Sequence, residues 1–179
     1  MTDNSPLLAV LASIRERGAI GEASLEAAIE HAEQFVAFIP EDAVSLVDLG
    51  SGGGLPGLVI AVRRPDLQVT LVERRTQRAD LLRRAVLSLG LAERVSVKGT
   101  DVRTVATASP RSFDVVTARS FAAPEVTATW ASKLLRAGGR LVVSEPPTDD
   151  ETRWPASLLD GLGLVDMGRE QGIRWFLRS

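Results

Sequence analysis

A glycine-rich run, Asp48-Leu-Gly-Ser-Gly-Gly-Gly-Leu-Pro-Gly57, is the segment of this sequence best suited to hold a small molecule. Glycines at positions 50, 52 and 54 let the backbone turn tightly and approach a ligand where a Cβ atom would obstruct it. An acid, Glu73, ends the next run of β-branched residues. Because a carboxylate there can accept hydrogen bonds from both ribose hydroxyls of an adenosine group, the two features together predict an adenosine-type pocket.

Four further residues lie at or just after the ends of predicted strands and are candidates for the same pocket. Asp48 is expected to orient the glycine loop or to reach the cofactor's amino group through water, and capping of the loop backbone is the alternative role. Asp101 and Val102 are placed to meet an adenine ring, with a helix N-cap as the alternative role of Asp101. Arg119 ends a strand where open α/β sheets bind ligands, and it is expected to hold a ligand carboxylate or RNA rather than a structural ion pair.

Short β-branched runs alternate with longer helical patterns after Pro40, which indicates a parallel sheet with crossover helices. The expected strands are 44–49, 68–73, 94–98, 113–118 and 140–144, followed by an antiparallel hairpin of 163–168 and 173–178. The expected helices are 6–17, 24–39, 56–63, 76–89, 123–136 and 149–159, with a short turn near 101–106. Gly90 and the pair Gly138-Gly139 are expected to stop helices.

These elements predict an α/β, Rossmann-like fold with a seven-stranded, mostly parallel sheet whose last strand is antiparallel. Residues 1–40 form a short helical N-terminal extension in this interpretation, and residues 41–179 form one cofactor-binding domain. The closing hairpin favours the class I methyltransferases, which use S-adenosylmethionine. A nicotinamide oxidoreductase stays a remote alternative, because the chain leaves little length for a further substrate region.

Composition excludes several kinds of site. The 179 residues contain no cysteine and one histidine, which excludes disulfides, a cysteine nucleophile and thiolate or His-rich metal sites, and no metal is expected. The formal net charge of -2 argues against a strongly basic nucleic-acid-binding surface, although local basic patches are compatible with it. Since no segment reads as a signal peptide or a membrane span, the protein is expected in the cytoplasm, without a membrane partner.

The glycine run, with its Pro56-Gly57 directly after the loop, resembles the RsmG (GidB) family of bacterial methyltransferases. The similarity continues through Glu73, Gln77-Arg78 and the segment 113–122, and it covers about residues 25 to 179. The resemblance implies an enzyme that transfers a methyl group from S-adenosylmethionine to guanine N7 in small-subunit (16S) ribosomal RNA, with the RNA or the small ribosomal subunit as partner. The oligomeric state is not implied.

The residues expected to contact the cofactor are Asp48, Gly50, Ser51, Gly52, Gly54, Leu55, Glu73, Arg74, Asp101, Val102 and Arg119. The residues expected to meet RNA are Arg78, Arg119 and Ser120. Guanine N7 carries a free lone pair and no proton, so no general base is needed, and Arg119 is expected to act catalytically through positioning. Two alternatives stay open: a related methyltransferase with another substrate, and a partner protein that binds the cofactor without catalysis.

The sequence departs from the family pattern near both ends of the chain. The N-terminal segment is short and lacks the family's Asn-Leu-Thr stretch, although His31 falls about where the family has a histidine. The lysine expected after the fifth strand is replaced by Ser144-Glu145-Pro146-Pro147. We expect this exchange to cost a cation beside the RNA entrance and to place a carboxylate there.

Other notable side chains have weaker functional signals. Five arginines at positions 74, 75, 78, 83 and 84 predict either a phosphate-binding stripe or a solvated helix face. His31 is expected to be a surface or core group, since a lone histidine carries no spacing signal. Trp130, Trp154 and Trp175 are scattered, so core packing is preferred over base stacking for each.

Overall fold

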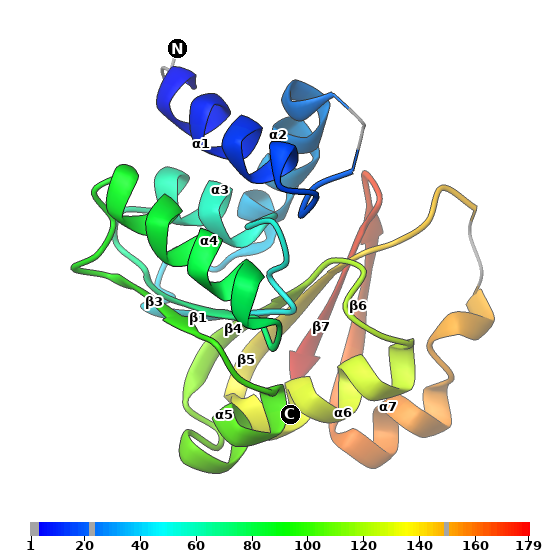
Figure 1. Cartoon of the computed structure of the whole chain (residues 1–179). Helices are drawn as coiled ribbons and strands as arrows, with labels where there is room; N and C mark the ends of the chain where they lie inside the picture. Colours follow the sequence, from blue (N-terminus) through cyan, green and yellow to red (C-terminus); the bar gives the residue numbers. More distant parts are fainter. Residues whose placement is uncertain (1–3, 22–23, 149–150) are drawn as a thin grey trace.

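The fold is built on one seven-stranded sheet, seen in a computed structural model that describes residues 4–21, 24–148 and 151–179 (Figure 1). The strand order is β3-β2-β1-β4-β5-β7-β6, and β7 runs antiparallel to both of its neighbours. The strands are β1 (Ser45–Leu49), β2 (Gln68–Val72), β3 (Val95–Lys98), β4 (Phe113–Ala118), β5 (Leu135–Ser144), β6 (Leu164–Glu170) and β7 (Ile173–Arg178). The predicted sheet, including its antiparallel end, is confirmed.

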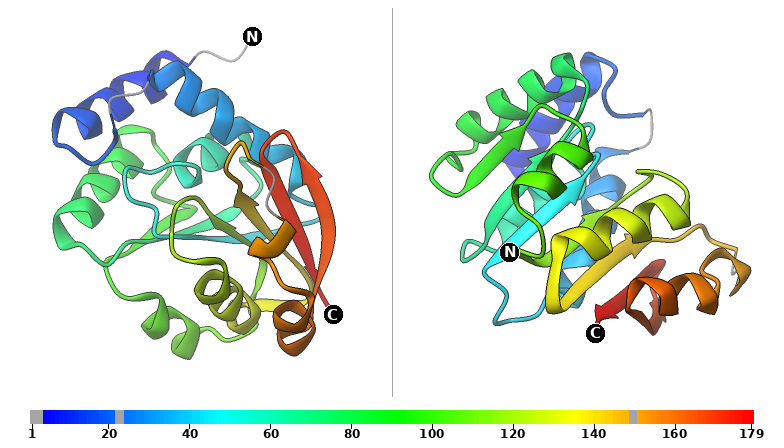
Figure 2. Two further views of the ribbon diagram at one scale, coloured as in Figure 1. Left: turned by 90° about the vertical axis from the view of Figure 1, so that its right-hand side faces the viewer. Right: turned by 90° about the horizontal axis from the view of Figure 1, so that it is seen from below.

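Helices cover both faces of this sheet (Figure 2). One face is packed by α1 (Ser5–Glu16), α2 (Leu25–Gln34), the 3₁₀ helix η1 (Phe35–Phe38), α3 (Gly57–Arg63) and α4 (Thr76–Ser88). The other is packed by α5 (Val102–Ala108), α6 (Pro124–Leu134) and α7 (Ala156–Leu162), with the 3₁₀ helix η2 (Glu151–Arg153) on the connection before α7. The central strands β1 and β4 are covered on both faces, so their residues are buried almost without interruption rather than in alternation.

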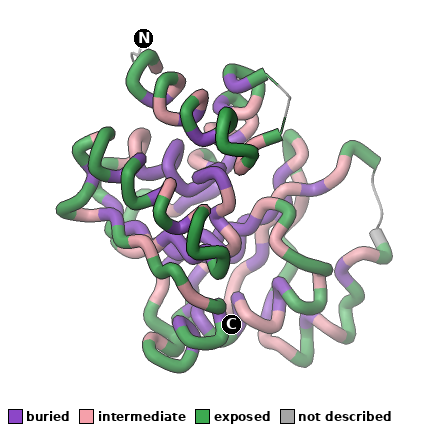
Figure 3. Tube along the Cα trace, in the orientation of Figure 1, coloured by how far each residue is buried: buried purple, intermediate pink, exposed green. Residues whose placement is uncertain are grey.

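The strand side chains divide between two hydrophobic cores. Leu46 of β1 lies in the core beneath α1 to α4, while Val47 and Leu49 lie in the core beneath α5 to α7. Neighbouring strand residues point to opposite faces, so the apolar residues of one strand serve both layers. The tube in Figure 3 shows this burial concentrated in the middle of the molecule.

The two N-terminal helices pack against the sheet domain. Leu7, Leu11 and Ile14 are buried and repeat at helical spacing along α1, which contacts α2 and α4. In α2, Ile29 and Ala32 join the same core. The division of the chain at residue 40 stays a prediction, since these helices share the hydrophobic core of the first face.

The predicted helix 149–159 is wrong. Residues 149–150 lie outside the described part, and the remainder is divided into η2 and α7 by Pro155, which is the N-cap of α7. Proline disfavours a helical conformation in the residue before it and donates no backbone hydrogen bond, so the chain restarts the helix after Pro155. Gly163, with φ of 64°, ends α7 in the left-handed conformation.

Three other boundaries differ from expectation. The predicted helix 24–39 tightens into η1 after Gln34, and the turn near 101–106 is the helix α5. The predicted helix 123–136 ends at Leu134, and Gly138 and Gly139 lie within β5, where the register against β4 shifts. No described helix is long and apolar enough to cross a membrane.

Candidate functional site

The glycine loop leaves β1 at the carboxyl ends of β1, β2 and β4. Gly50, Gly52 and Gly54 have φ values of +63°, +54° and +95°, a region that favours glycine. A Cβ atom on Gly50 would lie 2.7 Å from Cδ2 of Phe121, and one on Gly57 would lie 2.7 Å from Oδ2 of Asp48. The positive φ values and the short distances to neighbouring side chains therefore explain why glycine occupies these positions.

Glu73 follows β2 and braces the glycine loop. The residue is buried, with only 6% of its surface exposed. The backbone N–H of Gly52 donates to Oε2 at 3.0 Å, and that of Arg75 donates to Oε1 at 2.8 Å. Since each carboxylate oxygen has two lone pairs, one on each oxygen is left for a ligand donor.

A cavity of about 440 Å³ opens beside Glu73, and we call it the Glu73 cavity. It is formed by the loop after β1, the ends of β2 and β3, and helices α4, α5 and α6. Seven residues of the predicted site line it: Gly50, Glu73, Arg74, Arg78, Asp101, Val102 and Ser120. The structure therefore brings together residues that are up to 70 positions apart in the sequence.

The other predicted cofactor residues lie behind this wall. Asp48 and Ser51 are buried, and with Gly52, Gly54 and Leu55 they are absent from the lining of the Glu73 cavity. Arg119 lies instead in a neighbouring cavity. The structure thus places the loop residues next to the Glu73 cavity rather than on its lining, and their contact with a cofactor stays a prediction.

Asp101 is the N-cap of α5. Its Oδ1 accepts a hydrogen bond from the backbone N–H of Arg103 at 2.9 Å, so the capping role is present. Asp101 is exposed and also lines the Glu73 cavity beside buried Val102. The two roles considered for Asp101 are thus compatible in space.

Asp48 connects the glycine loop to β4. Oγ1 of Thr117 donates to Oδ1 of Asp48 at 2.7 Å, and the hydroxyl of Ser51 donates to the Asp48 carbonyl at 3.0 Å. Oδ2 has no hydrogen-bond partner among the described residues. Burial raises the pKa of Asp48 to about 6, although the hydrogen bond from Thr117 and the charge of Arg119 act in the opposite direction.

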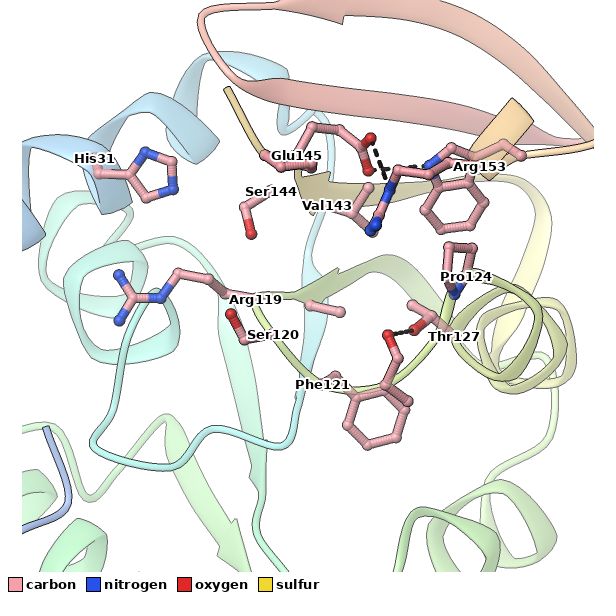
Figure 4. Close-up of a pocket in the computed structure, with 14 residues that line it drawn as sticks. His31, Arg119, Ser120, Phe121, Pro124, Thr127, Val143, Ser144, Glu145 and Arg153 are labelled. Atoms are coloured by element: carbon pink, nitrogen blue, oxygen red, sulfur yellow. Dashed lines mark hydrogen bonds and ion pairs between the residues drawn. The ribbon is translucent and has the colours of Figure 1, made fainter. Parts of the chain in front are cut away.

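A second cavity, of about 520 Å³, adjoins the first, and we call it the Glu145 cavity (Figure 4). The two cavities share the segment Ser120-Phe121-Ala122 as a common wall. Ser120 adopts a φ of 53°, which is uncommon for a residue other than glycine. The segment that separates the two cavities thus contains a residue in an uncommon backbone conformation.

Arg119 lines the Glu145 cavity and is half-buried. Burial lowers the pKa of its guanidinium, and the charge of Asp48 opposes this shift. Within the described part of the chain, the guanidinium makes no hydrogen bond or ion pair. A cation with this burial and without a close partner is suited to bind an anionic group.

His31 of α2 faces Arg119 across the Glu145 cavity (Figure 4). Its ring meets Phe35 edge-on, with centroids 6.0 Å apart. Burial lowers the pKa of His31, and the nearby charge of Arg119 acts in the same direction. Residue spacing in the sequence did not indicate that His31 lines a cavity. The only signal was that the RsmG family has a histidine at about the same place.

Glu145 has two partners from the connection after β5. Nε1 of Trp154 donates to Oε1 at 3.0 Å, and Nε of Arg153 lies 3.2 Å from Oε2. Arg153 therefore places a cation beside Glu145 in the wall of this cavity, where the family lysine is missing from the sequence. Sequence reasoning missed Arg153, which lies eight residues beyond Glu145 in a segment expected to be continuous helix.

Some of the arginines near α4 and one of the tryptophans line the Glu73 cavity, whereas others have structural contacts. Arg74, Arg75 and Arg78 line the Glu73 cavity, whereas Arg83 forms an ion pair with Asp80 at 2.6 Å. Trp154 is buried, and Trp175 stacks on Phe38, in agreement with core packing. Trp130 differs, since it is half-buried and lines the Glu73 cavity. No group of three potential metal ligands is present among the described residues.

The strand order, the antiparallel β7, the glycine loop and the acid after β2 define a class I methyltransferase fold. A geranyl diphosphate C-methyltransferase from Streptomyces coelicolor, solved with S-adenosyl-L-homocysteine, has a similar fold, with a TM-score of 0.65 and 13% identity. The match covers 84% of this chain and 79% of that enzyme.

The family model for rRNA small subunit methyltransferase G (GidB) matches residues 11–151, so the chain belongs to this family. The ribosomal RNA small subunit methyltransferase G of Salinispora tropica is 42% identical over 124 residues, covering 66% of this chain and 51% of that protein. The corresponding protein of Kineococcus radiotolerans is 40% identical over 125 residues, covering 68% and 47%. The chain thus spans about half the length of these curated relatives, and the resemblance inferred from its motifs is confirmed.

Proposed function

We propose that this chain is an S-adenosylmethionine-dependent methyltransferase that methylates guanine N7 in small-subunit (16S) ribosomal RNA. The observation that carries the proposal is the pair of cavities that meet at Ser120–Ala122, one beside Glu73 and one beside Arg119. A methyl donor in one cavity and an acceptor base in the other would meet at that boundary. Family membership supplies the acceptor class.

The Glu73 cavity fits the adenosine part of the cofactor. Its volume of about 440 Å³ falls within the roughly 300 to 1,000 Å³ of small-molecule sites. The free lone pairs of Glu73 suit the two ribose hydroxyls, and Asp101 with Val102 suits the adenine edge. Arg74 and the loop residues Gly50, Ser51, Gly52, Gly54 and Leu55 complete the proposed cofactor site, with Asp48 holding the loop to β4 through Thr117.

Arg119 is assigned to the methionine end of the cofactor and to the reacting geometry. Its guanidinium, without a close partner among the described residues, would bind the methionine carboxylate and thereby fix the methyl group at the cavity boundary. When bound, S-adenosylmethionine supplies an electrophilic methyl group on a sulfonium. Guanine N7 offers a lone pair in line with it, so the protein's part is positioning and the exclusion of water, without proton removal.

The acceptor RNA is assigned to the side where the Glu145 cavity opens. Arg119 and Ser120 on the Glu145 cavity, with Arg78 on the neighbouring Glu73 cavity, are the proposed RNA contacts. Ribosomal RNA or the small subunit is the proposed partner, met in the cytoplasm. We assign cofactor binding to residues 41–179. The extension 1–40 contributes His31 to the wall of the acceptor cavity.

The test is a transfer assay with methyl-labelled S-adenosylmethionine, using naked small-subunit RNA and whole small subunits from a strain that lacks the endogenous N7 methylation. Borohydride reduction followed by aniline cleavage identifies N7-methylated guanine. The proposal predicts label in the RNA and a cleavage product that depends on the protein. Label at another atom or in another substrate would support a related enzyme of different specificity, and cofactor binding without any transfer would support a non-catalytic partner.

A further inference from the structure

A third cavity, of about 340 Å³, lies among the C-terminal ends of α5, α6 and α7, and we call it the basic cavity. Three cations line it, Arg111, Lys133 and Arg178, and no acidic residue of the described chain does. Arg111 precedes β4 and Arg178 ends the antiparallel β7, so the cavity lies at the amino ends of the parallel strands. The glycine loop lies at the other end of the sheet.

The positive charge of this cavity is not neutralised by the protein. Arg111 and Lys133 form no ion pair within the described part of the chain. The ammonium of Lys133 lies 4.7 Å from the centroid of the Trp130 ring, and Arg178 donates one N–H to the carbonyl of Leu162 at 2.8 Å. Because the chain as a whole has a net charge of -2, three cations around one cavity are a local excess of positive charge.

The C-terminal end of α6 has hydrogen-bond partners without these side chains. Cations near a helix C-terminus commonly interact with its free carbonyls, which would be a purely structural role. Here the carbonyls of Lys133 and Leu134 already accept the backbone N–H groups of Arg111 and Ser112, both at 2.9 Å. Only Arg178 donates a side-chain hydrogen bond to a helix end. The charges of Arg111 and Lys133 are therefore available to an anion from outside the chain.

Helix α6 connects the basic cavity to the proposed site of methyl transfer. Its first residue, Pro124, lines the Glu145 cavity, Trp130 lines the Glu73 cavity, and Lys133 lines the basic cavity. Figure 1 shows α6 between α5 and α7, which it contacts on either side. From Pro124 to Lys133 the helix rises about 14 Å, at 1.5 Å per residue. A nucleic-acid strand that rises roughly 3.4 Å per nucleotide covers this distance in about four nucleotides.

We propose that the basic cavity binds a backbone phosphate of the acceptor RNA, a few nucleotides from the guanine that is methylated. Phosphate oxygens only accept hydrogen bonds, and the side chains of Arg111, Lys133 and Arg178 only donate them. A contact of this kind fixes the position of the strand without reading its sequence. The inference rests on the proposed function and adds a second point of attachment for the RNA, distant from the methyl donor.

The first test measures how the affinity for RNA depends on salt. The full chain, saturated with S-adenosylhomocysteine, is titrated into a labelled single-stranded RNA of about twelve nucleotides, uridines with one central guanosine, and binding is followed by fluorescence anisotropy. Loss of one phosphate contact reduces the slope of log K against log salt by about 0.7 for a single strand. The double variant Arg111→Met/Lys133→Met should therefore bind more weakly, with a slope reduced by that amount, and bind S-adenosylhomocysteine as before.

The matched control is Arg15→Met/Arg17→Met. It removes the same charge from exposed positions at the C-terminal end of α1, on the other face of the sheet, and should keep the wild-type slope. An equal change of slope in both double variants would assign the effect to net charge and overturn the inference. A lower melting temperature of Arg111→Met/Lys133→Met with an unchanged slope would assign the two cations to the helix ends and overturn it as well.

The second test uses the wild-type protein, so it does not depend on the folding of a variant. The chain has only two lysines, Lys133 and Lys98. Lys98 is exposed at the end of the edge strand β3 and lines none of the three cavities, so it is the internal reference. With the same RNA at about ten times its Kd, acetylation of Lys133 followed by mass spectrometry should slow by about tenfold, while that of Lys98 should not change.

Each other result of the acetylation test is decisive. Equal acetylation of Lys133 with and without RNA, equal protection of both lysines, or no RNA binding by a folded protein would overturn the inference. Protection of Lys133 by inorganic phosphate but not by the RNA would assign the cavity to a small anion instead.

Failure of this inference is distinguishable from failure of the proposed function. If methyl transfer to guanine N7 fails while Lys133 is protected and the slope changes, the proposed reaction is wrong and the RNA-phosphate site stands. If transfer succeeds while the slope and the acetylation of Lys133 are unchanged, the reaction stands and the RNA follows another path over the protein.

Discussion

Replacing Glu73 with alanine removes the carboxylate that braces the glycine loop and faces the proposed ribose position. In the folded protein this carboxylate accepts the backbone N–H groups of Gly52 and Arg75, at 3.0 and 2.8 Å. Gly52 is half-buried and Arg75 is exposed, so water can replace much of what is lost. We expect about 1 kcal/mol of destabilisation, which lowers the melting temperature by about 2–4 °C.

The expected loss of cofactor affinity is larger. Hydrogen bonds to a charged group contribute about 1.5–3 kcal/mol each, and the proposed site places two ribose hydroxyls on Glu73. Taking the lower value for both gives about 3 kcal/mol, or roughly a hundredfold in Kd. The loss of binding free energy should therefore exceed the loss in the free energy of unfolding.

Calorimetric titration of S-adenosylmethionine into wild-type and Glu73→Ala protein measures this difference, with the melting temperature as the check on folding. Glu93→Ala removes an exposed carboxylate of the same kind outside both cavities and should change neither quantity. A folded Glu73→Ala protein whose Kd stays within about threefold of wild type would refute the ribose assignment.

Three further predictions concern the loop and the charged groups around it. Gly50→Ala and Gly90→Ala both place a side chain at positive φ, but only position 50 has a ring 2.7 Å from the new Cβ atom. The backbone strain should lower the free energy of unfolding of both variants by about 1 kcal/mol, measured by denaturant titration. Only Gly50→Ala should weaken cofactor binding in calorimetry. Asp48, whose pKa is raised from 3.8 to about 6, binds its proton more tightly in the folded state, so the free energy of unfolding should fall as pH rises through that window. Urea denaturation should show a fall of about 3 kcal/mol for this group, and Asp48→Asn should abolish it. Arg119→Met should weaken S-adenosylmethionine binding at least about tenfold and leave adenosine binding unchanged, because adenosine has no carboxylate; equal losses for both ligands would contradict the assignment.

The sheet could be predicted because its signals are local. Each parallel strand is a short β-branched run bounded by a turn, and Gly168 to Gly172 left room only for a hairpin. The boundary between α6 and β5 failed because it depends on non-local pairing. The residues after Leu134 join β5 early because β4 offers a partner, and the two glycines there lie in a shifted register rather than after a helix.

The cofactor side of the site was more predictable than the acceptor side. Gly50, Glu73 and Asp101 follow strands whose carboxyl ends meet at one edge of the sheet, so their proximity follows from the topology. The partners of Asp48 and Glu145 do not follow in this way. Thr117 reaches Asp48 from 69 residues away, and Arg153 pairs with Glu145 from a segment that was expected to be continuous helix.

The central claim is that the Glu73 cavity holds S-adenosylmethionine, and calorimetric titration of the purified chain tests it most directly. S-adenosylmethionine and S-adenosylhomocysteine are titrated separately, with NAD as the comparison ligand that shares the adenosine. The account predicts one site per chain for the first two ligands and no measurable heat of binding for NAD. Binding of NAD alone, or of none of the three by a folded protein, would contradict it.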